Sequence, residues 1–316
     1  MADKKIITVI GATGAQGGGL VRAIQADPSG QFQARAVTRD PNSDKAKALA
    51  ALGAEIVHAD IDDAASVDAA FRGAYGAYCV TFFWAHFSAE REMAEAKAMA
   101  EAAARENVEH VIWSTLEDVR TFVPLSDESM PTLQGKYKVP HFDGKGASDA
   151  YFAQAGAPTT YLLTSFYWEN MLYFGMNPKP DGNGRYALTL PIGDARMSGM
   201  AAEDIGKCAY SIFKQGKDLI GHHVGVAGDH ITGGQMADGL ARALGIDVYY
   251  NPIEPTAYRA LGFPGADDLG NMFQFYRDFE QAFVDARNLN YARHLNPQLL
   301  SYHDWVEKNK ALIPLT

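Results

Sequence analysis

The sequence predicts an α/β protein built on a doubly wound parallel sheet. Through the first half of the chain, short apolar runs alternate with amphipathic stretches of helical period, beginning with an apolar run at residues 6–10. Parallel strands need crossover helices, and such crossovers are almost always right-handed, so this alternation favours helices on both faces of one sheet. A glycine-rich turn that directly follows the first run and opens a helix points the same way.

The predicted elements follow one another closely. After the first helix we expect a strand at 33–38, a helix at 44–52, a strand at 54–59, a helix at 64–71, a strand at 77–81, an alanine-rich helix at 89–106 and a strand at 110–114. Residues 124–140 are polar and contain prolines and glycine, so they predict a loop. A helix at 143–155 and a strand at 159–164 come next.

The second half of the chain is less regular. Residues 165–200 and 250–316 mix short strands, prolines and aromatic-rich helices, which predicts a smaller α/β lobe interleaved in sequence with the sheet domain. We expect the sheet domain to comprise residues 1–164 and about 196–228, and the smaller lobe residues 165–195 and 229–316.

Composition and charge exclude several classes of function. The chain has 316 residues, 47% of them hydrophobic, and a net charge of −10, which argues against direct binding to nucleic acid or to an anionic membrane. No apolar run approaches the roughly 18 residues that span a bilayer. The two cysteines, Cys79 and Cys208, lie far apart and predict a reduced compartment, so we expect a cytoplasmic protein. No ligand spacing predicts a metal site.

The glycine-rich turn predicts a cradle for the pyrophosphate of a dinucleotide. Gly11 permits the tight turn, Gly14 lets the backbone approach a phosphate, and Gly17 lets the helix pack close to the strand. A glycine turn with no ligand is the alternative, and the strand before it and the helix after it favour nucleotide binding. The candidate residues are Gly11, Thr13, Gly14, Ala15, Gln16 and Gly17.

The end of the second strand indicates which dinucleotide is bound. Sites for NAD place Asp or Glu there, whereas this chain has Thr38 and Arg39. A guanidinium offers paired donors to a 2′-phosphate, so Arg39 predicts NADP(H); a solvated surface arginine is the alternative. Asp40 and Asp44 would repel the phosphate if they faced it.

Two further strand ends hold candidate cofactor residues. Asp60, Ile61 and Asp62 follow the third strand and contact the adenine edge, or else cap the next helix. Thr81, Phe82 and Phe83 follow the fourth strand, where the aromatic rings, with Trp84, either line a flat apolar cleft suited to a quinone or an aromatic carbonyl, or belong to the core.

Residues 141–145 keep the spacing of a dehydrogenase motif. Short-chain dehydrogenases use a Tyr and a Lys four residues apart on one helix face, and this chain has His141 and Lys145 at that spacing. Lys145 is the candidate ribose ligand, and His141 is either a proton donor or a capping and packing residue. Farther along, Tyr167 and Asn170 either contact the nicotinamide end of a cofactor or form an aromatic hinge between the lobes.

Several segments together resemble the NmrA-like branch of the atypical short-chain dehydrogenases. They are residues 11–17, 37–39, 141–146 and 166–170, and residues 261–266 and 271–276 are similar to mammalian redox-sensing members of that family. The likeness covers about residues 5–310. It implies a Rossmann domain with a small α/β lobe, a preference for NADP(H) over NAD(H), and signalling through partner proteins.

The resemblance also implies roles for individual residues. By motif match, Arg39 takes the 2′-phosphate, Lys145 the nicotinamide ribose, and Tyr167 lies by the nicotinamide. The sequence departs from the family pattern in two places: Asn42, Ser43 and Asp44 stand where further basic residues are common, and the loop at 121–140 is longer than expected.

These observations support one leading hypothesis and two alternatives. The leading hypothesis is an NADP(H)-binding, redox-sensing regulator with a regulatory protein partner and, as one alternative, a homodimeric assembly. The first alternative is an NADPH-dependent reductase of quinones or related carbonyl compounds, with Lys145, His141 and Tyr167 as candidate catalytic residues. The second, a scaffold with an inactive nucleotide pocket, leaves the intact glycine turn unexplained.

Overall fold

The chain folds into two units whose sequences are interleaved, and the computed structural model describes residues 4–315. The first unit comprises the chain up to Glu117, together with Gly144–Thr164 and Ala202–Val224. The second comprises Asp118–Asp143, Ser165–Ala201 and the chain from Gly225 onward. Each unit is therefore assembled from segments that lie far apart in the sequence.

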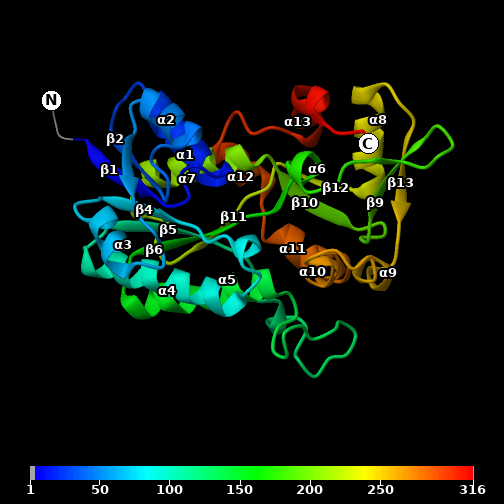
Figure 1. Ribbon diagram of the computed structural model, residues 1–316, viewed down its shortest axis with the longest axis horizontal. Helices are drawn as coiled ribbons and strands as arrows, with labels where there is room; N and C mark the ends of the chain where they lie inside the picture. Colours follow the sequence, from blue (N-terminus) through cyan, green and yellow to red (C-terminus); the bar gives the residue numbers. More distant parts are fainter. Residues whose placement is uncertain (1–3, 316) are drawn as a thin grey trace. The chain divides into compact units, whose positions relative to one another are not determined.

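A seven-stranded parallel sheet forms the centre of the first unit (Figure 1). Its strand order is β11-β6-β5-β4-β1-β2-β3, so the order reverses between β1 and β4. The chain first adds β2 and β3 on one side of β1 and then β4, β5 and β6 on the other, which is the doubly wound arrangement that the sequence predicted. The strands are β1 (Lys5–Val9), β2 (Phe32–Thr38), β3 (Glu55–His58), β4 (Gly76–Cys79), β5 (His110–Thr115), β6 (Thr159–Leu163) and β11 (His223–Gly225).

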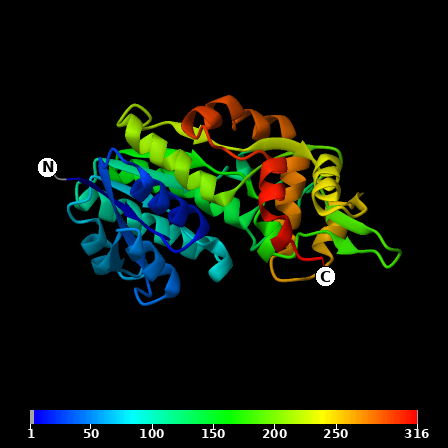
Figure 2. The same cartoon turned by 90° about the horizontal axis from the view of Figure 1, so that it is seen from above.

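Helices cover both faces of this sheet. Figures 1 and 2 show α1 and α7 side by side on one face, with α3 and α4 on the opposite face. A 3-10 turn, η1, precedes α4, and α5 begins in the second unit and continues into the first. The bounds are α1 (Ala15–Ala26), α2 (Asp44–Ala51), α3 (Ala64–Phe71), η1 (Phe83–Ala85), α4 (Ala89–Arg105), α5 (Pro140–Ala155) and α7 (Ala202–Gln215).

The largest change from a predicted boundary is at the start of α5. The sequence predicted this helix from Asp143, but it begins at Pro140. Proline suits a first helical position because it has no N–H to leave unbonded and its φ is already helical. Asp143 lies inside the helix, where its carboxylate accepts hydrogen bonds from the backbone N–H groups of Val119, Lys138 and Val139. His141 therefore lies in the first turn of the helix.

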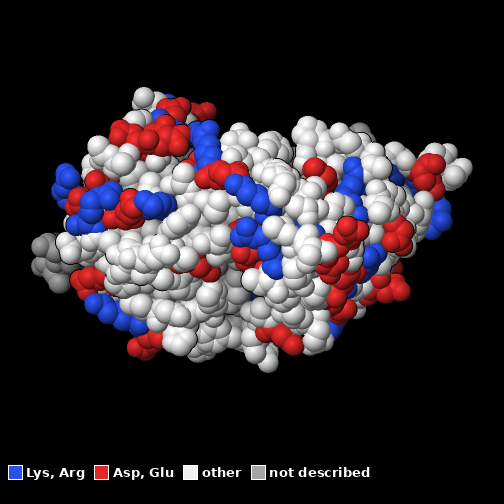
Figure 3. Space-filling model, turned by 90° about the horizontal axis from the view of Figure 1, so that it is seen from below, with Lys and Arg blue, Asp and Glu red and all other residues white. Residues whose placement is uncertain are grey.

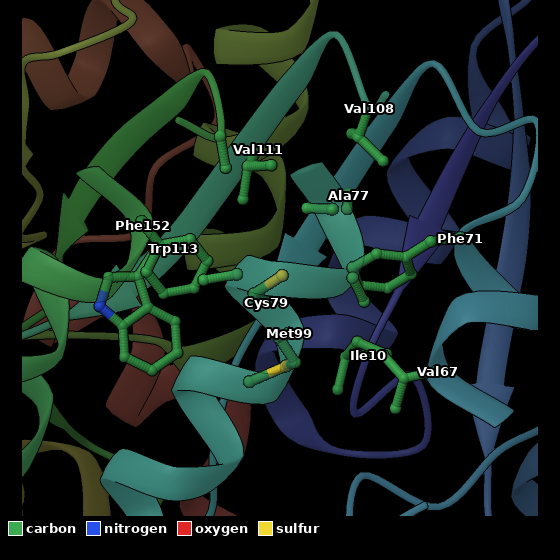
Figure 4. Close-up of a cluster of buried hydrophobic side chains, with 14 of the residues drawn as sticks. Ile10, Val67, Phe71, Ala77, Cys79, Met99, Val108, Val111, Trp113 and Phe152 are labelled. Carbon is green, nitrogen blue, oxygen red and sulfur yellow. The ribbon is translucent and has the colours of Figure 1, made fainter. Parts of the chain in front are cut away.

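The core of the first unit lies between the sheet and the helices α3, α4 and α5. Figure 4 shows the labelled members of this cluster, among them Ile10, Cys79 and Met99, all of which are buried. Trp113 of β5 stacks on Phe152 of α5 with 5.0 Å between ring centroids. Cys79 packs inside this cluster, and burial raises the pKa of its thiol.

Two glycines bring α1 and α7 into backbone contact. A Cβ at Gly19 would lie 2.4 Å from the carbonyl oxygen of Glu203, and a Cβ at Gly206 would lie 2.1 Å from the backbone nitrogen of Leu20. Real Cβ atoms do not approach backbone this closely, so any larger residue at either position would force the helices apart. This contact fixes α1, the helix that follows the glycine-rich turn.

The second unit contains two three-stranded sheets with the orders β12-β10-β7 and β13-β9-β8. Helix α8 packs on β13 and β9, and the Thr232 side chain caps its first turn. The strands are β7 (Phe166–Tyr167), β8 (Lys179–Pro180), β9 (Tyr186–Leu190), β10 (Arg196–Met200), β12 (Asp229–Thr232) and β13 (Val248–Pro252). The helices are η2 (Val119–Thr121), α6 (Asn170–Tyr173), α8 (Gly233–Leu244), α9 (Pro255–Arg259), α10 (Ala266–Asp278), α11 (Glu280–Asp285), α12 (Leu289–Leu295), α13 (Tyr302–Asn309) and η3 (Lys310–Leu312).

The predicted loop at residues 124–140 belongs to the second unit, and its last residue, Pro140, begins α5. Side chains hold the rest of the loop in place. The buried Lys138 donates from Nζ to the carbonyl oxygens of Asp127 and Met130, and Asn271 of α10 donates to those of Pro131 and Lys138. These bonds satisfy backbone carbonyls that have no regular ladder to join.

Candidate functional site

The candidate site lies at the carboxyl edge of the first unit's sheet. In open α/β sheets, ligands bind beyond the carboxyl ends of the strands where the strand order reverses. Here that point falls between β1 and β4, so the segments that follow Val9 and Cys79 border the site. The glycine-rich turn and Thr81 are therefore brought to the same edge.

In the glycine-rich turn after β1, the backbone of Gly11 lies so close to Gly14 and Gly17 that little room is left for side chains there. Gly11 has a φ of +66°, which a residue with a Cβ rarely adopts. A Cβ at Gly14 would lie 3.1 Å from the carbonyl oxygen of Gly11, and a Cβ at Gly17 would lie 2.5 Å from that same atom. Gly17 is thus required for the helix to begin so close to the turn, which agrees with the packing role that the sequence suggested.

The N-terminus of α1 is open to a ligand. Gly14 is the N-cap residue, no side chain within residues 4–315 makes a capping hydrogen bond there, and the first turn contains no acidic residue. Gly14 and Ala15 are exposed, and Thr13 is half-buried. Gln16 is buried, and its side-chain oxygen Oε1 accepts hydrogen bonds from the hydroxyl groups of Tyr78 on β4 and Ser114 on β5. Gln16 therefore ties the helix start to the central strands.

The end of β2 presents Arg39 to solvent. Arg39 is exposed, and within residues 4–315 its guanidinium makes no hydrogen bond or ion pair. The Thr38 hydroxyl accepts from the backbone N–H of Asp40, and the Asp40 carboxylate accepts from that of Asn42. The carboxylate of the adjacent Asp40 is thus hydrogen-bonded within its own turn. A ligand that binds Arg39 would therefore not have to displace a partner from residues 4–315.

Residues 60–62, between β3 and α3, do not cap α3. Asp63 is the N-cap of that helix and accepts from the N–H of Ala65, so the capping interpretation of residues 60–62 is wrong. Asp60 instead accepts from the N–H of Asp62, whose carboxylate pairs with Arg91 of α4 at 2.6 Å. Ile61 is partly buried against the core.

After β4, the structure brings Thr81 and Lys145 together. Lys145 Nζ donates to the Thr81 hydroxyl at 2.7 Å, and that hydroxyl donates to the Glu92 carboxylate at 2.7 Å. The ammonium lies 3.2 Å from the same carboxylate and 5.1 Å from the centre of the Trp113 ring. The lysine predicted as a ribose ligand is therefore held at the edge of the sheet by three neighbours.

Sequence reasoning missed Glu92. It lies on α4 with Ala96, Met99 and Ala103, all buried, at the spacing of one helical face. A buried carboxylate on a largely apolar face needs a partner of opposite charge. That pattern is visible in the sequence and is the signal that could have identified Glu92.

The aromatic residues after Thr81 divide into two kinds. Phe82 is 59% exposed, whereas Phe83 is 2% exposed and packs edge to face on Trp84 at 5.3 Å and on Phe87 at 6.0 Å. Phe83 is thus a packing residue, whereas Phe82, directly after Thr81, exposes its apolar ring to solvent.

The predicted acid His141 belongs to the second unit. It is buried, and its Nδ1 lies 2.5 Å from the carboxylate of Asp268 on α10. The ring also packs edge to face on Phe142. These contacts agree with the capping and packing alternative, and a proton-donating role for His141 stays a prediction.

Tyr167 and Asn170 also lie in the second unit. Tyr167 ends β7 and is half-buried, and Asn170 begins α6, where its backbone carbonyl accepts from the N–H of Phe174. Between them, Trp168 is buried and packs edge to face on Tyr302 and at a tilt on Trp305. The aromatic segment thus contributes to the core of its unit, and its contact with a ligand stays a prediction.

On the face drawn in Figure 3, basic and acidic side chains are interspersed and no continuous basic field is visible. Residues 4–315 contain no group of three His, Cys, Asp or Glu side chains arranged to hold a metal ion. No helix in that range has the length and apolar character needed to cross a bilayer.

Comparison with known proteins identifies the family. The model of the NmrA-like family matches residues 3–307. The chain belongs to the NmrA-like family. The curated NmrA-like oxidoreductase FrzB from a Cladobotryum species is 28% identical over 283 residues, covering 85% of this chain and 83% of that protein.

Solved structures share the fold of this NmrA-like chain. NmrA, a negative transcriptional regulator solved in complex with NADP, superposes with a TM-score of 0.78 at 22% identity, covering 96% of this chain and 95% of the other. The triphenylmethane reductase of a Citrobacter species, complexed with NADP(H), gives 0.75 at 17% identity over 96% and 99%. At these identities the likeness establishes the Rossmann-like architecture of the NmrA-like chain.

Proposed function

We propose that this NmrA-like chain binds NADP(H) at the carboxyl edge of the first unit's sheet. The observation that carries the proposal is the turn in which Gly17 has no room for a Cβ. This turn leads into a helix whose N-cap, Gly14, brings no capping side chain. The backbone N–H groups at a helix start and the positive end of the helix dipole suit a pyrophosphate, and no acid in the first turn opposes it.

Two basic residues support the phosphorylated dinucleotide and its orientation. Arg39 is exposed at the end of β2, without an internal partner within residues 4–315, and suits a 2′-phosphate. Lys145 suits the hydroxyl groups of the nicotinamide ribose, because its ammonium is fixed at the end of β4 by Thr81 and Glu92. Thr13, Ala15 and the segment at 60–62 complete the proposed contacts with the pyrophosphate and the adenine.

The proposed role is that of a redox-sensing regulator in the cytoplasm. The residue at the acid position of the dehydrogenase motif, His141, is buried and paired with Asp268, which favours cofactor binding without a proton relay from that ring. A bound cofactor shifts an equilibrium between two conformations only by its differential affinity for them. The loops at 82–84 and 124–140 are proposed to respond, and a regulatory protein partner reads the change.

A second candidate is an NADPH-dependent reductase of quinones or related carbonyl compounds. It is supported by Phe82, whose exposed ring directly follows Thr81 and offers a flat apolar surface. The naming of FrzB as an oxidoreductase favours the same class. When bound, the reduced cofactor supplies a hydride, and this chain's contribution is to orient it through Lys145 and Thr81.

Two measurements separate these functions. Calorimetry of the pure protein with NADP⁺ and NADPH tests binding, and the absence of heat at millimolar cofactor would refute both candidates. Absorbance of NADPH in the presence of a panel of quinones tests turnover. Tight binding without turnover supports the regulator, whereas turnover above background that Lys145→Ala abolishes supports the reductase.

A further inference from the structure

The buried carboxylate of Glu92 is not explained by packing. Its side chain is fully buried, and its Oε2 has no hydrogen-bond partner among residues 4–315. Replacing a buried ion pair with apolar side chains of similar volume is often neutral or stabilising, so stability alone does not account for an acid here. Its one close cationic partner among the described side chains is Lys145, at 3.2 Å.

The hydrogen bonds around Glu92 run in one direction. The ammonium of Lys145 donates to the Thr81 hydroxyl, whose single proton is then donated to Glu92 Oε1. The ammonium–carboxylate contact closes this triangle. A lysine ammonium sits on a flexible four-carbon side chain. The triangle formed by Lys145, Thr81 and Glu92 fixes the position of its charge without a ligand.

The surrounding backbone is shaped to admit the carboxylate. A Cβ at Gly144, the residue before Lys145, would lie 3.2 Å from Glu92 Oε2 and 3.4 Å from the Cβ of Ala89. Glycine at this position therefore lets α5 approach α4 closely enough for the Lys145 ammonium to reach the carboxylate.

The triangle leaves one direction of the ammonium for a ligand. Lysine has three N–H donors, and the strong acceptors here are the Thr81 hydroxyl at 2.7 Å and the Glu92 carboxylate at 3.2 Å. The remaining approach, to the Thr81 carbonyl oxygen, is 3.4 Å and is the weakest of the three. A ligand hydroxyl can replace it without disturbing the other two.

From this geometry we infer that Glu92 is a positioning residue, which acts through Lys145 to hold the nicotinamide ribose of the cofactor. The inference rests on the proposed function, because it requires a bound dinucleotide. It predicts that the loss of the Glu92 charge weakens the nicotinamide half of the site and leaves the adenosine half intact.

The test compares two ligands that differ in this respect. NADPH carries both halves, whereas 2′,5′-ADP carries the phosphorylated adenosine and lacks the nicotinamide ribose. In Glu92→Gln, which keeps the shape and removes the charge, we expect the affinity for NADPH to fall by about tenfold. The affinity for 2′,5′-ADP should stay within about twofold of the wild type. The same holds for any correctly folded variant that is altered only in the nicotinamide half of the site.

Glu95→Gln is the matched control. Glu95 lies on the same helix and is almost as buried, but it pairs with Arg91 instead of Lys145. We expect this variant to bind both ligands as the wild type does. Melting temperatures of all variants without ligand report any general loss of stability.

A double-mutant cycle tests whether Glu92 acts through the lysine. In a Lys145→Met background, Glu92→Gln should cause no further loss of NADPH affinity, because the group that it positions is absent. Additive losses would overturn the inference. If Glu92→Gln does not fold, Thr81→Val carries the test, and the same selective loss of NADPH affinity is expected.

The outcomes separate this inference from the proposed function. If the wild type binds neither ligand, the proposed function fails. If the wild type binds both, but Glu92→Gln weakens both equally or weakens neither, the role of Glu92 fails while the proposed function stands.

Discussion

A Cβ at position 17 would lie 2.5 Å from the carbonyl oxygen of Gly11 and 2.8 Å from its carbonyl carbon. The clash is with backbone atoms of Gly11 and Ala12, so no change of rotamer relieves it. The start of α1 and the turn after β1 therefore hold their relative position only with glycine at 17. Because the same turn is proposed to bind the pyrophosphate, both the backbone conformation of the turn and its affinity for the cofactor depend on the lack of a Cβ at position 17.

We expect Gly17→Ala to lower both stability and cofactor affinity. Overpacking against backbone costs about 1–3 kcal/mol in the free energy of unfolding. Displacing the helix start removes backbone donors from the phosphate, so the affinity for NADPH should fall by about tenfold or more. Urea unfolding and calorimetry measure the two effects.

Gly234→Ala is the control for that substitution. Gly234 lies in the first turn of α8 in the second unit, and the nearest atom to an added Cβ is 3.8 Å away. Alanine is the better helix former by up to about 1 kcal/mol, so this variant should be as stable as the wild type or slightly more stable. If both alanine variants behave alike, the backbone clash is not the cause.

The elements of the first unit could be predicted because their signals are local. Apolar runs of strand length, the glycine-rich turn and the helical period of residues 89–106 all act within a few residues of the chain. The predicted start of α5 lies too late in the chain. Aspartate is typical of a helix cap, but the Asp143 carboxylate accepts hydrogen bonds from the N–H groups of Lys138 and Val139 from inside the first turn. Local propensity therefore predicts that α5 forms, whereas hydrogen bonds to the Asp143 side chain determine where it begins.

The partners of the site residues could not be predicted, because they come from distant parts of the sequence. His141 pairs with Asp268, 127 positions away, and no local pattern links them. Lys145 was identified from its motif, but the carboxylate that holds it comes from α4. Motif spacing therefore identified the lysine, while only the fold shows which charge stands beside it.

Arg39→Ala should reduce the preference for NADP(H). Hydrogen bonds to a charged group contribute about 1.5–3 kcal/mol, so the affinity for NADPH should fall by about 10- to 100-fold. NADH lacks the 2′-phosphate and should bind within about twofold of the wild-type affinity. Arg72→Ala, which removes another exposed arginine paired with Glu106, controls for the change in net charge. Equal losses for the two cofactors would reject the assignment of the 2′-phosphate.

His110 should make the fold sensitive to acid. Burial lowers the pKa of its ring from 6.5 to about 4, and its Nε2 contacts the Thr160 hydroxyl at 2.9 Å. Because the unfolded chain takes up this proton near pH 6.5, stability present above that pH is lost as the pH falls toward 4, by about 3 kcal/mol at most. In His110→Gln, urea unfolding between pH 7 and 4 should show a smaller loss of stability. Parallel pH profiles for the two proteins would contradict this.

His223 should show the opposite dependence on pH. Its hydrogen bond to the Asp149 carboxylate, at 2.8 Å, is the main cause that raises the pKa of the ring above 6.5. The stabilisation from this pair is therefore complete below pH 6.5 and is lost as the pH rises through the folded-state pKa. In Asp149→Asn, an NMR titration of the ring should give a lower pKa than in the wild type. Asp68→Asn, which removes a carboxylate paired with Arg105, should leave that titration unchanged; a similar fall in both variants would mean that net charge, not the Asp149 contact, sets the pKa.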